Sequence, residues 1–265
     1  MAQWCIQFTL EQLLKVKEGY GDDYNRIIGK TNLTPSECES WKKVADNMYF
    51  PFSEEQGVYL QQDGFLDKDL VKVAALDKTE RPINQKWSWD RILRSPYIKQ
   101  ADVLQGFYFF EENFTLEELE KHFDFYEPFT VHESSLSPCV HSIQAAKLGR
   151  MDQAYTFYLR TSRLDLDDYN KEVEEGLHIT SMAGTWMSIV EGFGGMRVVN
   201  DILSFEPRIP KQWESYSFKV NFRNRILKVK VSQDELHIEL KGDEELMILI
   251  NGKEFKLASN TTTII

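Results

Sequence analysis

The stretch Phe218-Lys219-Val220-Asn221-Phe222 alternates apolar and polar side chains residue by residue. An alternation with a period of two is typical of a β-strand that buries one face. Later runs repeat this pattern at 227–231, 236–240 and 246–250, and turn-forming pairs accompany them: Arg223-Asn224, Gln233-Asp234, Gly242-Asp243 and Asn251-Gly252. We therefore predict an antiparallel meander with one buried face over residues 201–265. It would form a small β-sheet or sandwich domain that packs against helices or completes a larger sandwich.

Residues 1–200 carry helical signals instead. The stretch 1–20 spreads apolar residues around much of a helix, so this helix needs neighbours on more than one side. Residues 53–98 are rich in aromatics and prolines and predict a long loop with short helices. Capping residues mark further helix starts at Thr34-Pro35-Ser36-Glu37, at Thr115 with Glu118, at Ser137-Pro138, at Asp152 and at Thr180 or Ser181, and Gly149 and Gly192 mark two ends. The fold class is mainly α with a C-terminal β domain.

Composition limits the classes of function. The chain has 265 residues and is 42% hydrophobic, which is enough for a buried core and two domains. A mean hydropathy of -0.43 without a long apolar run excludes a transmembrane helix, and no signal-peptide pattern follows Met1. Cys5, Cys38 and Cys139 have no metal-type spacing and indicate reduced thiols in a cytoplasmic protein. A net charge of -11 argues against nucleic acid and anionic membranes as partners.

Lys99 and Gln100 form a polar pair at the start of a helix predicted over 101–110. An ammonium group beside an amide offers several donors and one acceptor, which suits two adjacent sugar hydroxyls. A surface Lys-Gln pair is the alternative. The apolar residues around the pair favour partial burial and a binding role: Tyr97, Ile98, Ala101, Val103 and Leu104.

A second polar cluster, His132-Glu133-Ser134-Ser135, precedes the helix that begins at Ser137-Pro138. Hydrogen bonding within the loop and helix capping explain most of such a segment.

The third cluster runs from His178 through Thr180 and Ser181 to Gly184 and leads into a helix. Backbone N–H groups at a helix N-terminus bind anions, and the helix dipole adds partial positive charge. The histidine and two hydroxyls add further donors, and the glycine lets an oxyanion approach the backbone. An ordinary N-cap is the alternative, but the combination favours a phosphate site.

These three clusters, together with 145–154 and 192–197, resemble the disaccharide phosphorylases of glycoside hydrolase family 65, the maltose phosphorylase group. The resemblance runs from residue 1 to about 257. It implies an N-terminal β-sandwich, an (α/α)6 barrel and a small C-terminal β domain, of which residues 1–200 are the second half of the barrel. It also implies cleavage of an α-glucosidic disaccharide, maltose first among the candidates, by inorganic phosphate to β-glucose 1-phosphate and glucose.

The resemblance further implies a cytoplasmic full-length protein that is a homodimer, with phosphate as co-substrate and with neither metal nor cofactor. Lys99 and Gln100 would hold the transferred glucose, and the 132–135 segment would shape the pocket. Glu133 is not expected to be the catalytic acid, because the family places its acid elsewhere. The phosphate would be bound by His178, Thr180, Ser181 and Gly184. Phosphate is already an anionic nucleophile, so the base carboxylate of an inverting hydrolase is not needed and would repel it.

One family feature is missing from the sequence. The general acid is a Glu in a Gly-Pro-Asn/Asp-Glu-Tyr type motif, which does not occur in these 265 residues and by resemblance would lie before Met1. We therefore expect a C-terminal fragment that has no catalytic residue of its own and is inactive alone. Two alternatives stay open: an inverting α-glucoside hydrolase that uses Glu174 or Glu175, and a non-catalytic carbohydrate-binding fragment. The sequence leaves the identity of the disaccharide open.

Overall fold

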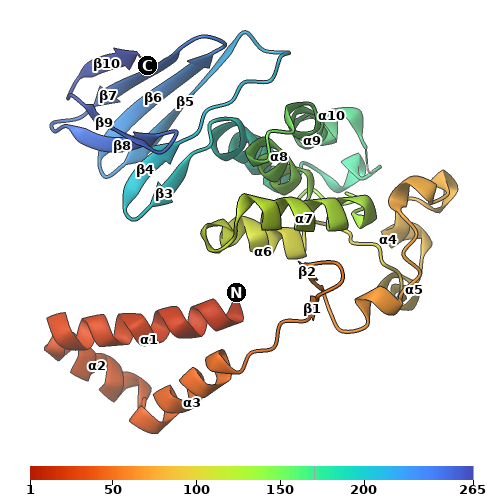
Figure 1. Ribbon diagram of the computed structural model, residues 1–265, viewed down its shortest axis with the longest axis horizontal. Coiled ribbons are helices and arrows are strands. Elements are labelled where there is room, and N and C mark those ends of the chain that lie inside the picture. The colour runs from red at the N-terminus through yellow and green to blue at the C-terminus, as the bar shows by residue number, and fades with distance from the viewer. Residues whose placement is uncertain (170, 265) are drawn as a thin grey trace. The chain divides into compact units, whose positions relative to one another are not determined.

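The computed structural model describes residues 1–169 and 171–264, and the side chain of Glu175 lies outside the described part. The chain forms two compact units, Met1–Asp63 and Gly64–Ile265 (Figure 1). This division falls inside the helical part predicted for 1–200. Within the described residues, no helix is both long enough and apolar enough to cross a membrane.

The first unit contains α1 (Ala2–Gly19), α2 (Gly21–Thr31), α3 (Pro35–Asp46), β1 (Phe52–Ser53) and β2 (Val58–Tyr59). Gln3 Nε2 donates to the carbonyl of Ala45 at 2.9 Å and joins α1 to α3. The side chain of Thr34 caps α3 as predicted, by accepting from the backbone N–H of Glu37. No residue of α1 is buried, although its apolar residues predict neighbours on more than one side.

The second unit begins with short helical turns, which confirms the prediction for 53–98. These are η1 (Phe65–Asp67), η2 (Val73–Ala75), η3 (Lys78–Glu80), α4 (Ile83–Lys86) and α5 (Trp89–Arg94). Phe65 is fully buried and packs its ring against Phe125, Tyr126 and Phe129 at centroid distances of 5.8–6.3 Å. This aromatic cluster fixes the loop to the longer helices.

The longer elements are α6 (Val103–Phe109), η4 (Glu111–Asn113), α7 (Leu116–Tyr126), η5 (Glu127–Phe129), α8 (Pro138–Lys147), α9 (Met151–Ser162), α10 (Leu164–Asp167), η6 (Val173–Glu175), α11 (Ile179–Met187) and the π-helical turn η7 (Ser188–Phe193). Thr115 and Glu118 form the predicted capping box, with both reciprocal bonds present. Two predicted starts are displaced, because α9 begins before Asp152 and α11 begins before Thr180 and Ser181. Neither helix is capped by a hydroxyl.

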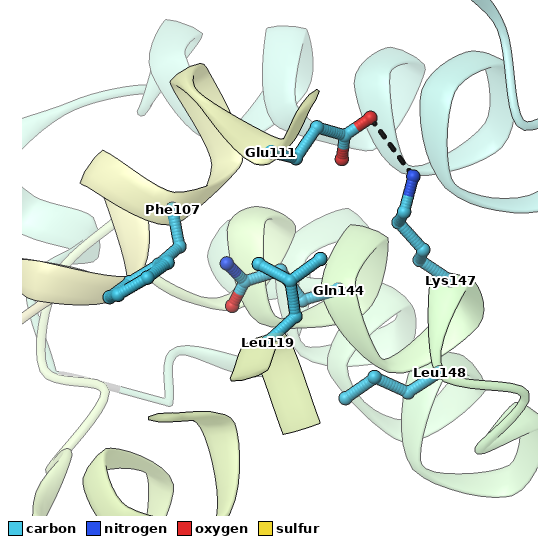
Figure 2. A pocket seen from close by; sticks show the side chains of 6 residues that line it. All are labelled: Phe107, Glu111, Leu119, Gln144, Lys147 and Leu148. Carbon is cyan, nitrogen blue, oxygen red and sulfur yellow. Dashed lines mark hydrogen bonds and ion pairs between the residues drawn. The ribbon is translucent and has the colours of Figure 1, made fainter. Parts of the chain in front are cut away.

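Helix α8 is the centre of the helical part, since all but two of its residues are buried. It contacts α6, α9, α11 and η7. Figure 2 shows side chains of α6, α7 and α8 facing one another. The amide of Gln144 on α8 also donates to the carbonyl of Leu104 on α6 at 2.8 Å. A close-packed central helix of this kind holds the loops at its ends in fixed positions.

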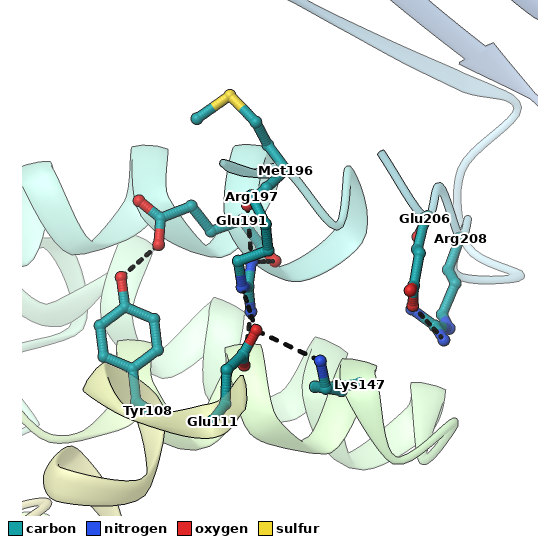
Figure 3. A network of polar contacts seen from close by, with 8 residues as sticks. All are labelled: Tyr108, Glu111, Lys147, Glu191, Met196, Arg197, Glu206 and Arg208. Atoms are coloured by element: carbon teal, nitrogen blue, oxygen red, sulfur yellow. Dashed lines mark hydrogen bonds and ion pairs between the residues drawn. The ribbon is translucent and has the colours of Figure 1, made fainter. Parts of the chain in front are cut away.

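Helices α6, α8 and α11 run in the same direction. Residues at their N-terminal ends are joined by hydrogen bonds between Ser134 and Gln100 and between Ser135 and Thr180. Side chains at their C-terminal ends are joined as well. At the far end, Lys147 Nζ donates to Glu111 Oε1 at 3.2 Å, and the hydroxyl of Tyr108 donates to Glu191 (Figure 3). The three N-terminal ends therefore gather at one side of the helical part and the C-terminal ends at the other.

The far end is also where the β domain is attached. The guanidinium of Arg197 binds the carboxylate of Glu111 and donates to the carbonyl of Glu191 at 2.8 Å (Figure 3). Burial alone would raise the pKa of Glu111, but the bonds from Arg197 and Lys147 outweigh it and lower this pKa. Two cations at the C-terminal ends of helices also complement the helix dipoles.

The β domain is a sandwich of two four-stranded sheets with one shared core. Its strands are β3 (Arg197–Val199), β4 (Ile202–Phe205), β5 (Ser215–Phe222), β6 (Arg225–Ser232), β7 (Leu236–Lys241), β8 (Leu246–Ile250), β9 (Lys253–Leu257) and β10 (Thr261–Ile264). The sheet orders are β10-β7-β6-β5 and β3-β4-β8-β9 (Figure 1). Residues of both sheets, such as Leu227 and Ile248, belong to one buried cluster that also includes Val190 of η7.

The prediction of one continuous meander is wrong at β8. Strands β5, β6 and β7 form the expected meander, but β8 crosses to the other sheet and pairs with β4 in parallel, Leu203 opposite Ile248. The physical reason is burial: in its place beside β4, β8 contributes Leu246, Ile248 and Ile250 to the core that the two sheets share. The tight hairpin turns at Arg223-Asn224 and Asn251-Gly252 are confirmed, with positive φ at all four residues.

Candidate functional site

The three polar clusters predicted from the sequence come together in the structure. The hydroxyl of Ser134 donates to Gln100 Oε1 at 3.0 Å, and the hydroxyls of Ser135 and Thr180 lie 2.8 Å apart. Gln100 precedes α6, the two serines precede α8, and Thr180 is in the first turn of α11. We call these four residues, together with Lys99, the polar rim.

The backbone brings the first two clusters side by side. Ile98 pairs with Thr130 in a parallel β-bridge, with hydrogen bonds of 2.8 and 2.9 Å on either side. Lys99 and Gln100 are exposed, so the partial burial that the sequence favours for this pair is wrong, whereas the flanking Ile98, at 4% exposure, is buried. The buried residue thus anchors the strand and leaves the polar pair available at the surface.

His132 is a buried pivot of the second cluster. Its φ is 54°, an uncommon value for a non-glycine residue, and its ring Nδ1 lies 2.9 Å from the hydroxyl of Ser137. Ser137 therefore holds this ring and does not cap α8 with its side chain. Burial lowers the pKa of His132 well below its ordinary value and that of the adjacent His141 to about 4, so both rings are neutral at pH 7.

Glu133 anchors the loop from the inside. It is 3% exposed, its Oε1 accepts from Arg81 Nε at 2.8 Å, and its Oε2 accepts from the backbone N–H of Ile83 at 2.6 Å. Both carboxylate oxygens therefore serve structure, in keeping with the expectation that Glu133 is not the acid. The sharp turn at His132 and this anchor together aim the following serines at the polar rim.

The start of α11 is organised by a carboxylate. Asp165, in α10, accepts from the backbone N–H of His178 at 3.0 Å and lies 2.6 Å from its ring Nδ1. These two bonds, the backbone one first, lower the pKa of Asp165. On the other side of the ring, Nε2 lies 3.8 Å from Glu172 Oε2. Asp165 thus holds the N-cap residue of α11 through its backbone N–H and its ring.

Ser181 and Gly184 face the protein interior. The hydroxyl of Ser181 donates to the carbonyl of Thr161 at 2.6 Å, and the residue is 3% exposed. A Cβ at position 184 would lie 2.8 Å from the Cβ of Cys139, so glycine permits the close approach of α11 to α8. In this structure both residues fix the position of α11, while Thr180 is exposed.

Helix ends and Lys99 favour an anion at the polar rim, whereas the carboxylates of Asp165 and Glu172 beside His178 oppose one. The N-terminal ends of α8 and α11 lie beside the rim, and each contributes partial positive charge and N–H groups. Lys99 adds a cation near a site that also contains three hydroxyls. Sugar hydroxyls and a phosphate would both find donors here.

Glu174 and Glu175 are the carboxylates considered for a hydrolase. Glu174 is exposed, and the side chain of Glu175 lies outside the described residues. Sequence reasoning missed Asp165 and Arg81, which hold His178 and Glu133. Neither has a local signal, because they lie 13 and 52 residues away along the chain from the residues they bind.

Comparison with known protein families gives matches over most of this chain. A model described as the glycosyl hydrolase family 65 central catalytic domain matches residues 1–187, and one described as the family's C-terminal domain matches 196–257. Maltose phosphorylase of Bacillus subtilis is 51% identical over 93% of this chain and 32% of its own length. Alpha,alpha-trehalose phosphorylase of Thermoanaerobacter brockii is 40% identical over 97% of this chain and 33% of its own length.

A solved structure gives the same picture. The chain named "Putative kojibiose phosphorylase from human microbiome" superimposes with a TM-score of 0.89 at 38% identity, over 99% of this chain and 38% of that one. Our chain thus spans about a third of the length of the curated relatives.

Proposed function

The chain belongs to glycosyl hydrolase family 65, and we propose that it is part of an inverting disaccharide phosphorylase that uses inorganic phosphate. The observation that carries the proposal is the polar rim, where hydrogen bonds join Gln100 to Ser134 and Ser135 to Thr180 at the N-terminal ends of three helices. The products would be β-glucose 1-phosphate and a second sugar. Maltose is our first candidate substrate, because identity to the maltose phosphorylase is higher than to the trehalose enzyme.

The proposed chemistry assigns one side of the reaction to this chain. Lys99 and Gln100 hold hydroxyls of the transferred glucose. Phosphate, bound by His178, Thr180 and the first turn of α11, attacks the anomeric carbon from the face opposite the leaving oxygen. A C–O bond to phosphate forms as the glycosidic C–O bond breaks, and the leaving oxygen takes a proton from an acid. Ser181 and Gly184 would contribute by fixing the first turn of α11.

The first prediction separates a phosphorylase from a hydrolase. In a family-length polypeptide that carries these 265 residues, we expect maltose consumption to require inorganic phosphate and to yield β-glucose 1-phosphate in equal amount to glucose. The measurement is product analysis with and without phosphate. Two glucose molecules per maltose without phosphate would identify a hydrolase and overturn the proposal, and so would maltose binding without turnover under both conditions.

The second prediction concerns the donor-sugar pair. Lys99→Ala and Gln100→Ala, each in that family-length polypeptide, should lower kcat/KM about tenfold or more for every glucosyl donor, because each loses a hydrogen bond to the transferred sugar. Lys121→Ala is the matched control, since Lys121 forms a surface pair with Glu117 on α7. Unchanged kinetics with Lys99→Ala or Gln100→Ala would show that the pair is merely part of the surface.

A further inference from the structure

We propose that Asp165 is a positioning residue for His178: it keeps the ring proton on Nδ1 and directs Nε2 toward the phosphate. This inference rests on the proposed function, because it assigns a partner to a residue of the proposed phosphate site. Asp165 does not touch substrate in the proposal and acts only through His178.

The geometry carries this assignment. The carboxylate uses one oxygen for each bond: Oδ2 accepts from the backbone N–H of His178 at 3.0 Å, and Oδ1 lies 2.6 Å from the ring Nδ1. A carboxylate can only accept, so Nδ1 must carry the proton. The two bonds leave the ring little freedom to rotate, and both side chains are largely shielded, at 20% exposure for His178 and 14% for Asp165.

A proton on Nδ1 determines which hydrogen bond Nε2 can form. Free histidine prefers its proton on Nε2, and a partner on Nδ1 reverses this preference. In the neutral ring, Nε2 then presents a lone pair, which can accept a hydrogen bond from a protonated phosphate oxygen. In the charged ring it presents an N–H, which can donate to a phosphate oxygen. Glu172 Oε2, 3.8 Å from Nε2, is the charged group that faces this nitrogen.

A purely structural role is the competing explanation. Asp165 accepts from the N-cap residue of α11 and would stabilise the helix N-terminus even if the ring were irrelevant. The two roles differ in what they predict for the ring. A structural cap leaves the position of the ring proton without consequence, whereas a positioning residue makes phosphate binding depend on it.

The test is nitrogen-15 NMR of the whole 265-residue chain, with His178→Gln to identify the His178 resonances among the five histidines. We expect a protonated Nδ1 and an unprotonated Nε2 in the neutral ring, and the reverse in Asp165→Asn and Asp165→Ala. Asp167→Asn is the matched control, because Asp167 lies in the same short helix but binds Arg163. A proton on Nε2 in the unmodified chain, or no change in Asp165→Asn, would overturn the proposal.

Kinetics in the family-length polypeptide give the second readout. Asp165→Asn should raise KM for phosphate about threefold to tenfold, as expected for one weakened hydrogen bond, with little change in KM for the disaccharide. An equal rise in both constants would indicate a structural cap and contradict the positioning role. If His178→Gln leaves KM for phosphate unchanged, the phosphate site itself is misplaced, and the NMR result still decides the Asp165 contact.

Discussion

We expect the 265-residue chain by itself to form no β-glucose 1-phosphate from maltose and phosphate at a rate typical of an enzyme. The reason is the missing proton donor. General acid catalysis contributes about 10²–10⁴-fold to such reactions, and the Gly-Pro-Asn/Asp-Glu-Tyr motif of the family does not occur in this sequence. Glu133, the carboxylate beside the polar rim, is held by Arg81 and Ile83 and is not available as an acid.

The assay is release of glucose 1-phosphate by the purified chain, with the Bacillus subtilis maltose phosphorylase as positive control. Addition of a polypeptide that supplies the upstream two thirds of a family member should restore turnover if the two parts associate. Turnover by the chain alone would contradict the expectation and would require an acid among its own residues. In that case Glu174→Gln and Glu175→Gln would be the first variants to measure.

Local signals predicted much of the helical part. The capping box at Thr115 and Glu118 formed as expected, and α8 begins at Pro138 where the sequence indicates. Helices α9 and α11 begin before the predicted caps, and no side chain caps either helix. The contact of Asp165 with His178 could not be predicted, because no local pattern reveals a carboxylate 13 residues away.

Strand prediction succeeded where one face is buried and failed where both are. Strands β5, β6 and β7 alternate and were predicted, whereas β4 is buried on nearly all its residues and shows no period of two. The crossing of β8 to the second sheet could not be predicted either, because β8 has the same alternation as its neighbours. The sheet that a strand joins depends on how its side chains pack in the core that the two sheets share. Sequence periodicity does not show which of the two sheets that is.

The candidate site was predicted as clusters but not as an arrangement. Each of the three segments was recognised by residue type, and the structure joins them through Gln100, Ser134, Ser135 and Thr180. Sequence spacing places Ser181 and Gly184 on one face of α11, but it could not show that this face is the buried one. The support beneath the rim depends on Arg81 and Asp165, whose contacts bridge 52 and 13 residues of the chain.

The anchor beneath the polar rim gives the largest expected effect on stability. Glu133→Ala removes the carboxylate that binds Arg81 and leaves the buried N–H of Ile83 without its acceptor. Removal of one partner from a buried ion pair costs about 3–5 kcal/mol. The side chain of Arg81 is 29% exposed and keeps some contact with water. We therefore expect the free energy of unfolding to fall by about 3 kcal/mol, the low end of that range, which lowers the folding equilibrium constant more than a hundredfold.

Chemical denaturation of the whole chain measures this loss. Hydrogen exchange is then measured at the backbone amides of Arg81 and Ile83 and of residues 131–135. Glu117→Ala is the matched control: it breaks the surface pair with Lys121, whose side chains are 77% and 52% exposed, and should change stability by less than about 0.5 kcal/mol. Glu133→Gln keeps an acceptor for Ile83 and should lose about half as much as alanine, because only the charge is removed. If Glu133→Ala proved no more costly than Glu117→Ala, the carboxylate would not be the anchor, and the turn at His132 would have to hold Ser134 and Ser135 in place alone.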